Sequence, residues 1–182
     1  MRRAMATAMA EAAVASAPRR KRVVAAARRS SPLVKVEVRR VTREGWVPGS
    51  TALKRWATLA LGRRARGREL SVLVVGPARS RSLNRRYRGQ DSATNVLSFP
   101  AAPLANRALA SLGDLVICPQ VLQREARAQG KAPRAHWMHM VIHGVLHLIG
   151  HDHEQPAQAQ TMERREARLL RSLGVANPYR SG

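Results

Sequence analysis

The sequence predicts an α+β domain: a small mixed β-sheet of about four strands, with helices packed around a central helix that bears histidines. Two patterns predict this class. Short segments with strand periodicity are interspersed with longer segments of helical periodicity, and one helical segment is apolar nearly all round. A chain of 182 residues with a hydrophobic content of 45% also suffices for one compact domain, which we expect over residues 32–182.

The first half of this domain is expected to alternate strands with helices. Val34, Val36 and Val38 alternate with polar residues, which is the period of a strand with one buried face. Gly49-Ser50 offers an N-cap for the helix that follows, and Gly76-Pro77 separates a buried strand from a polar, arginine-rich helix. The expected elements are strands at 34–38 and 70–75, a helix at 50–62 and a short helix after residue 77.

Two further strands and three helices are expected in the second half. Pro119 and Pro133 each stand where the first turn of a helix tolerates proline, and Gly174 suits a C-cap. Because the segment Trp137–Ile149 is apolar on nearly every side, it belongs at the centre of the fold. Strands are expected at 95–99 and 115–118, separated by a loop over 100–113, and helices at 119–130, 133–149 and 157–173.

The balance of charge points to a polyanionic partner. Lysine and arginine total 33 against 11 acidic residues, which gives a net charge of +22, and arginine supplies nearly all of the positive side. Because the planar guanidinium suits phosphate, this surplus favours a nucleic acid. Aromatic residues make up only 3% of the chain, which argues against a surface that reads single strands by stacking each base.

The cysteine count and the hydropathy pattern bear on the compartment. Cys118 is the one cysteine, so the chain can form neither an intrachain disulfide nor a zinc cluster built on cysteines. It lies in an apolar run, and we interpret it as a buried core residue rather than a nucleophile. No stretch approaches the roughly 20 apolar residues that a membrane span requires. We therefore expect no membrane partner and a reducing, aqueous compartment, with the cytoplasm preferred over an organelle matrix.

Residues 1–31 differ from the rest in composition. They hold seven arginines and one lysine against one acid, so they carry +7 of the net charge, and their apolar residues are mostly alanine. They lack the apolar core of a secretory signal. We interpret them as a flexible, dispensable basic extension. An RNA-contacting arm, an organellar transit peptide and a start codon upstream of the true one are the alternatives.

All six histidines lie between residues 136 and 153. Four recur at every fourth residue, on one face of the expected central helix: His139, His143, His147 and His151. Residues i and i+4 can share one ion, but residue i+8 lies about 12 Å along the axis from the first. A third ligand must come from beyond the helix end, and Gly150 permits the reversal that brings His153 back. We predict one zinc ion per chain on His143, His147 and His153, with a fourth position for water.

The residue after the first ligand bears on the chemistry. The spacing His143-x3-His147-x2-Gly150-x2-His153 is similar to that of metzincin zinc peptidases, but Gly144 stands where those enzymes carry a general-base glutamate. A peptidase without this carboxylate would activate water poorly and would protonate the amine leaving group poorly. Phosphodiester cleavage can rely instead on the metal and a nearby cation. A zinc hydrolase that cuts RNA is therefore favoured over a zinc peptidase.

Further motifs accompany the histidines in a fixed order. They are Tyr87-Arg88-Gly89, Thr94-Asn95-Val96-Leu97-Ser98-Phe99-Pro100, Gly113-Asp114-Leu115-Val116-Ile117, and His143-Gly144-Val145-Leu146-His147-Leu148-Ile149-Gly150-His151-Asp152-His153. In these motifs the sequence resembles the YbeY family of bacterial endoribonucleases, over about residues 34–179. The resemblance implies a single-strand-specific metallo-endoribonuclease that acts in small-subunit (16S) ribosomal RNA 3′-end maturation and ribosome quality control. Its partners would be ribosomal RNA and the small subunit, with no DNA expected.

The resemblance also assigns roles to residues. It implies zinc ligands at the three histidines and a functional arginine at Arg88, whose guanidinium would bind the scissile phosphate through two hydrogen bonds. Arg85 and Arg86, on the same expected helix, are candidate RNA contacts. Asp152 is a candidate for orienting a ligand histidine.

Three residues depart from the usual family pattern. Gln90 replaces a lysine and Ala93 a proline, which loosens the loop after Arg88 and removes one charge, while His151 replaces a tyrosine and is a rival metal ligand. A second hypothesis of a different class stays open: a metal-stabilised ribosome assembly factor that binds ribosomal RNA with little catalysis.

Overall fold

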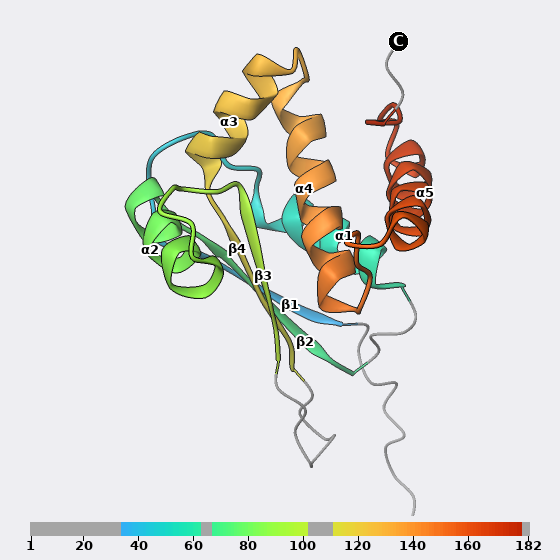
Figure 1. Cartoon of the computed structure of the whole chain (residues 1–182), viewed down its shortest axis with the longest axis horizontal. Coiled ribbons are helices and arrows are strands. Elements are labelled where there is room, and N and C mark those ends of the chain that lie inside the picture. Colours follow the sequence, from blue (N-terminus) through green and yellow to red (C-terminus); the bar gives the residue numbers. More distant parts are fainter. Residues whose placement is uncertain (1–33, 63–66, 102–110, 180–182) are drawn as a thin grey trace, which may run out of the picture. The chain divides into compact units, whose positions relative to one another are not determined.

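Four strands form one mixed sheet in the computed structural model, which describes residues 34–62, 67–101 and 111–179 (Figure 1). The strands are β1 (Lys35–Arg40), β2 (Glu69–Val74), β3 (Val96–Pro100) and β4 (Ser111–Ile117), in the order β1-β2-β4-β3. β1 and β2 run parallel, as do β2 and β4, whereas β3 is antiparallel to β4. The extension predicted at residues 1–31 lies outside the described residues.

Five helices complete the described fold. They are α1 (Ser50–Leu61), α2 (Pro77–Arg88), α3 (Pro119–Ala128), α4 (Pro133–Leu148) and α5 (Pro156–Ser172). α1 and α4 cover one face of the sheet, α2 lies on the other face, and α3 and α5 pack against α4 (Figure 1). The predicted class, a small mixed sheet with helices around a histidine-bearing central helix, is confirmed. None of the helices among the described residues is both long enough and apolar enough to cross a bilayer.

The central helix α4 is buried on almost every side, and Gly144 determines how closely it approaches the sheet. A Cβ atom at this position would lie 2.3 Å from Leu115 Cδ1 and 3.0 Å from Val96 Cγ2, so no side chain fits there without displacement. The Ser98 hydroxyl on β3 donates a hydrogen bond of 2.9 Å to the Gly144 carbonyl oxygen. α4 is therefore held against β3 and β4 next to two of the predicted ligands.

One local prediction is wrong. The loop expected over 100–113 ends earlier, because β4 begins at Ser111 and includes Gly113. Gly113 has a φ of +125° and a Cβ there would lie 2.1 Å from the Phe99 carbonyl oxygen, so only glycine fits this strand position. The N-cap of α1 is Gly49, within the predicted Gly49-Ser50 pair, and it makes no side-chain hydrogen bond. Cys118 is buried, as predicted, and burial raises the pKa of its thiol.

Candidate metal centre

Three imidazoles converge at the C-terminal end of α4. His143 and His147 lie one helical turn apart, and His153 follows in the connection to α5. Gly150, with a φ of +86°, allows the chain to turn back after the helix. One ring nitrogen of each histidine lies within 4.8 Å of a ring nitrogen of the other two. The structure thus brings together the three residues that the spacing selects.

The donor set and its spacing fit a tetrahedral metal ion. The Nε2 atoms of His143 and His147 lie 3.2 Å apart. Two ligands of a tetrahedral zinc at about 2.0–2.1 Å would lie about 3.3–3.4 Å apart, so the observed separation matches a shared cation. His143 and His147 are half-buried and His153 is exposed, which leaves the group accessible from solvent. Burial, followed by the neighbouring rings of His143 and His153, lowers the pKa of His147 and favours its neutral, metal-binding form.

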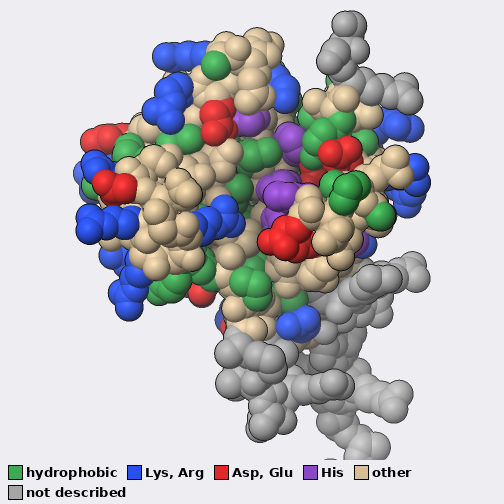
Figure 2. All heavy atoms as spheres, in the orientation of Figure 1, with side chains coloured by type: hydrophobic (Ala, Val, Ile, Leu, Met, Phe, Trp, Pro, Cys, Tyr) green, Lys and Arg blue, Asp and Glu red, His purple; other side chains and the backbone are tan. Residues whose placement is uncertain are grey.

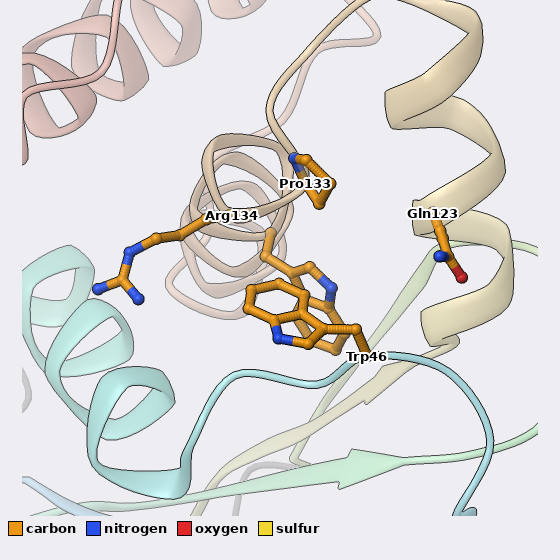
Figure 3. A pocket seen from close by; sticks show the side chains of 5 residues that line it. Trp46, Gln123, Pro133 and Arg134 are labelled. Atoms are coloured by element: carbon orange, nitrogen blue, oxygen red, sulfur yellow. The ribbon is translucent and has the colours of Figure 1, made fainter.

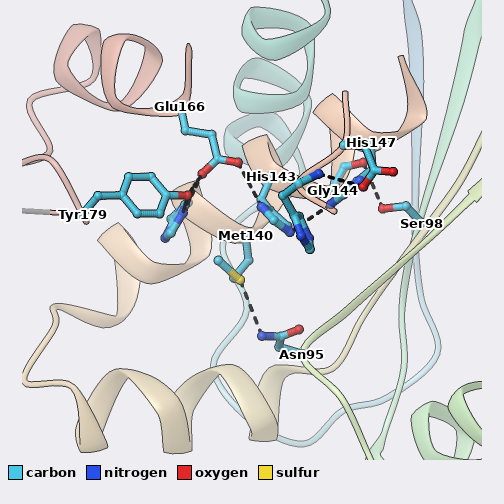
Figure 4. A network of polar contacts seen from close by, with 11 residues as sticks. Asn95, Ser98, Met140, His143, Gly144, His147, Glu166 and Tyr179 are labelled. Atoms are coloured by element: carbon cyan, nitrogen blue, oxygen red, sulfur yellow. Dashed lines mark hydrogen bonds and ion pairs between the residues drawn. The ribbon is translucent and has the colours of Figure 1, made fainter. Parts of the chain in front are cut away.

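A buried carboxylate contacts one of the predicted ligands from the side of α5. Glu166, on α5, has no exposed surface and its Oε1 accepts a 2.9 Å hydrogen bond from Nδ1 of His143. Its Oε2 accepts one of 2.8 Å from Nε2 of His139 and another from the Tyr179 hydroxyl (Figure 4). Burial opposes ionisation of Glu166, but the hydrogen bonds from His139, His143 and Tyr179 outweigh it and lower its pKa to about 2. Burial and the Glu166 carboxylate raise the pKa of the Tyr179 phenol.

The other histidines of the predicted stripe lie outside the metal group. His139 faces Glu166, and His151 accepts a 2.9 Å hydrogen bond at Nε2 from the Arg165 guanidinium. Asp152, the expected orienting residue, accepts a 2.7 Å hydrogen bond from the backbone N–H of His153. Its carboxylate therefore contacts the backbone of the connection that carries His153, while Glu166 contacts the ring of His143, a predicted ligand.

Sequence reasoning did not identify Glu166. A signal was present, because Met162, Glu166 and Leu170 are four residues apart on the expected last helix and share its buried face. A carboxylate in register with two core residues needs a polar partner. The sequence alone does not say that this face packs against the histidines of α4.

The three imidazoles line a pocket of about 400 Å³ together with Arg88. The other residues of its wall are Asn95, Val96, Ser98, Met140, Asp152 and Glu154. Figure 2 shows histidine side chains gathered in a hollow of this face of the molecule. Arg88 is the last residue of α2, which Gly89 ends in the left-handed conformation with a φ of +69°. The Arg88 guanidinium from α2 and the three imidazoles, two on α4 and one in the connection after it, thus share one cavity.

Arg85 and Arg86 lie elsewhere. They line a separate surface hollow of about 520 Å³ along α2, next to the ion pair between Arg81 and Asp91. The Arg86 guanidinium lies 5.5 Å from the centre of the Tyr87 ring. The structure does not place these two candidate RNA contacts in the histidine pocket.

A third pocket, of about 350 Å³, lies at the N-terminal end of α4. It is lined by Trp46, Gln123, Pro133, Arg134 and Trp137 (Figure 3). Its lining offers no carboxylate, imidazole or thiol, so it lacks the groups for metal binding or proton transfer. The histidine pocket is the better candidate for chemistry.

Comparisons with known proteins find a matching family model and several similar sequences. A family model described as "Endoribonuclease YbeY" matches residues 50–174. A protein of Alkalilimnicola ehrlichii named Endoribonuclease YbeY is 49% identical over 161 residues, which cover 85% of this chain and 96% of the relative. Proteins with the same name are 49% identical in Halorhodospira halophila, over 72% of this chain and 88% of the relative, and 47% identical in Pseudomonas entomophila, over 81% and 94%.

A solved structure has a similar fold. The solution structure of TM1509 from Thermotoga maritima aligns with a TM-score of 0.51 and 24% sequence identity, and the alignment covers 81% of this chain and 99% of that protein. At this level of identity the similarity concerns the arrangement of helices and strands.

Proposed function

The chain belongs to the YbeY family of endoribonucleases, and from this premise we propose that it is a zinc-dependent endoribonuclease, specific for single-stranded RNA, that acts in 16S ribosomal RNA 3′-end maturation and ribosome quality control. The observation that carries this proposal is the shared pocket of Arg88 with the three imidazoles. Its partners would be ribosomal RNA and the small subunit, its compartment the cytoplasm, and neither a membrane nor DNA is required.

His143, His147 and His153 would hold the ion. Bound zinc would polarise a phosphoryl oxygen and make water nucleophilic at neutral pH. The chain holds these three side chains close together by different means. α4 holds the first two one turn apart, and the Asp152 carboxylate fixes the backbone of the third.

Arg88 would act on the phosphate. Its guanidinium offers a fork of donors that binds two phosphate oxygens at once, and its charge opposes the negative charge that grows as the phosphorus gains a fifth bond. α2, the helix that carries Arg88, is anchored near its start, because the buried Ser80 hydroxyl donates to the Thr94 carbonyl oxygen at 2.8 Å and accepts from its N–H at 3.0 Å.

The setting of Gly144 argues against peptide hydrolysis. A Cβ at this position would point at Leu115 and Val96 on the sheet. A glutamate there would overlap Leu115 and crowd Val96, so the packing of α4 on the sheet leaves no room for a general base at this position. This is why we rank a zinc peptidase lowest.

Arg81, Arg85 and Arg88 lie at positions i, i+4 and i+7 of α2, so they share one face of this helix. Arg81 is engaged by Asp91 through bonds of 2.9 Å and 2.6 Å. We therefore propose that Arg85, with Arg86 beside it, contacts a phosphate next to the one bound by Arg88.

Cleavage of a single-stranded fragment from the 3′ end of 16S ribosomal RNA tests the proposal. We expect His147→Ala and Arg88→Glu each to lose about 100-fold or more in rate. Arg79→Glu is the matched control, because it makes the same charge change on the face of α2 opposite Arg88, nine residues away. Equal cutting by all four proteins would contradict the proposal. Normal ribosome maturation with Arg88→Glu, despite lost cleavage, would favour the assembly-factor hypothesis.

A further inference from the structure

Glu166 is an unusual residue for the interior of a protein. Its side chain has no exposed surface, and an isolated carboxylate in such a place is strongly unfavourable unless hydrogen bonds and opposite charge compensate it. The partners that the structure gives it among the described residues are two imidazoles and a phenol, from His139, His143 and Tyr179. No lysine or arginine within the described part of the chain forms an ion pair with it.

The contact with His143 decides which nitrogen of that ring is available. An ionised carboxylate can only accept hydrogen bonds, so the proton of the neutral ring lies on Nδ1, which is 2.9 Å from Glu166 Oε1. The lone pair is then on Nε2, the atom that lies 3.2 Å from Nε2 of His147. Glu166 thus fixes both the tautomer and the direction of this ligand.

The carboxylate itself is held on its other side. Oε2 accepts hydrogen bonds from His139, one turn before His143 on α4, and from Tyr179, which follows α5 (Figure 4). With both oxygens engaged, the carboxylate cannot rotate away from His143 without breaking a bond. A cation held by Nε2 of His143 would add a positive charge on the far side of that ring.

We propose that Glu166 is a positioning residue of the metal centre, which presents Nε2 of His143 to the ion and whose buried negative charge is compensated by that ion, with Tyr179 keeping the carboxylate in place. This proposal rests on the proposed metal role of His143, His147 and His153.

The chain contains a matched control for Glu166. Glu125 on α3 accepts a 2.9 Å hydrogen bond at Oε2 from Nε2 of His136, which lies on α4 as His139 and His143 do. The Asn95 amide also donates to both oxygens of Glu125, at 3.1 Å and 3.0 Å. This is a second carboxylate–imidazole pair against the same helix, but its histidine is outside the metal group.

Two measurements on the full-length protein test the proposal. After bound metal has been removed with a chelator, zinc affinity is measured by competition with a chromophoric chelator. Thermal unfolding of each metal-free protein is measured in parallel. Glu166→Gln is expected to bind zinc about 10- to 100-fold more weakly than the wild type, since it keeps the size of the side chain and removes the charge. Glu125→Gln is expected to lower the unfolding temperature but to leave zinc affinity within about threefold.

Each outcome decides between the proposals. Equal zinc affinity of the wild type and Glu166→Gln would overturn the positioning role and leave the metal site standing. Failure of the wild type to bind zinc would overturn the metal site itself. An equal loss of affinity in both glutamine variants would show a general effect of destabilisation and would also overturn the positioning role.

A second variant covers the case in which Glu166→Gln does not fold without metal. Tyr179→Phe removes only the hydroxyl that donates to Oε2 and leaves the bond to His143. It is expected to weaken zinc binding at least about threefold, as a single hydrogen bond to a charged group suggests. Unchanged affinity in this folded variant would overturn the proposal.

Discussion

At position 144 the lack of a side chain serves both packing and chemistry. The Gly144 backbone touches β3 through Ser98, and any Cβ would overlap Leu115 and Val96. A glycine in a helix interior normally costs about 1 kcal/mol relative to alanine. Its presence in α4 is explained by the close approach to the sheet, which keeps His143 and His147 at the edge of the pocket.

Gly144→Ala is therefore expected to destabilise the protein by about 1–3 kcal/mol, the usual cost of overpacking, despite the better helix propensity of alanine. Denaturant unfolding of the metal-free protein measures this. In a Leu115→Ala background the same change should cost less, because the nearest clashing atom is removed. A Gly144→Ala variant as stable as the wild type would contradict this account of α4 packing.

The three clustered histidines and the residues around them differ in how far their positions can be predicted from the sequence. The convergence of His143, His147 and His153 follows from helical spacing and one glycine, which is local information. Glu166 is placed by the packing of α5 on α4, and Tyr179 by the path of the chain after α5. The positions of Glu166 and Tyr179 depend on tertiary contacts. The sequence alone therefore favours a nearby acid, Asp152, as the residue that orients a ligand histidine, whereas the structure shows Glu166 in contact with the His143 ring.

At the level of elements, α2 must be tied to the strand beyond it for Arg88 to reach the pocket. Ser80 makes this connection, because its hydroxyl bonds both the carbonyl oxygen and the N–H of Thr94, just before β3. These two hydrogen bonds lie on the buried side of α2, where Ser80 is 1% exposed.

We expect Ser80→Ala to lower the free energy of unfolding by about 1–3 kcal/mol, since two backbone groups of the half-buried Thr94 lose their partner. RNA cleavage should fall with it, because α2 carries Arg88. Ser82→Ala, an exposed serine of the same helix, is the control and should leave both quantities unchanged. Comparable stability of the two variants would show that the Ser80 bonds do not anchor α2.

The pairing of α3 with α4 should produce a pH dependence. Burial opposes ionisation of Glu125, but the hydrogen bonds from His136 and Asn95, with a smaller effect of Arg124, outweigh it and hold its pKa below the ordinary 4.5. Its stabilisation is therefore fully present above the unfolded pKa and is lost as the pH falls through the lower folded pKa.

Unfolding free energies of wild type and Glu125→Gln, measured without metal from about pH 2 to pH 5, test this expectation. The difference between them should increase with pH over this range, because the variant lacks the titrating group. A difference that stays constant across the range would contradict the proposed role of the ionised Glu125.

For the whole molecule, the mixed character of the sheet followed from the pattern of strands and helices, but the strand order did not. β4 pairs with both β2 and β3, so β3 reaches the sheet edge as an antiparallel partner. Long-range pairing of this kind is set by packing across the domain. The arginine surplus indicated a nucleic-acid partner, but composition alone cannot say which arginine lies in the pocket with the histidines.

Deletion of residues 1–31 tests the interpretation of the basic extension. This change removes a net charge of +7 of the total +22. We expect zinc affinity to be unchanged and cleavage to stay within about threefold at physiological salt, because the remaining +15 still attracts the RNA backbone. A cleavage loss of more than about tenfold, with a shallower salt dependence, would instead indicate an RNA-contacting arm.

Anomalous diffraction at the zinc edge, from crystals of the zinc-loaded protein, tests the central claim most directly. A single strong peak is expected about 2.0–2.1 Å from Nε2 of His143, Nε2 of His147 and a ring nitrogen of His153. A zinc peak elsewhere in the molecule, or these three rings turned apart in a zinc-loaded crystal, would contradict it.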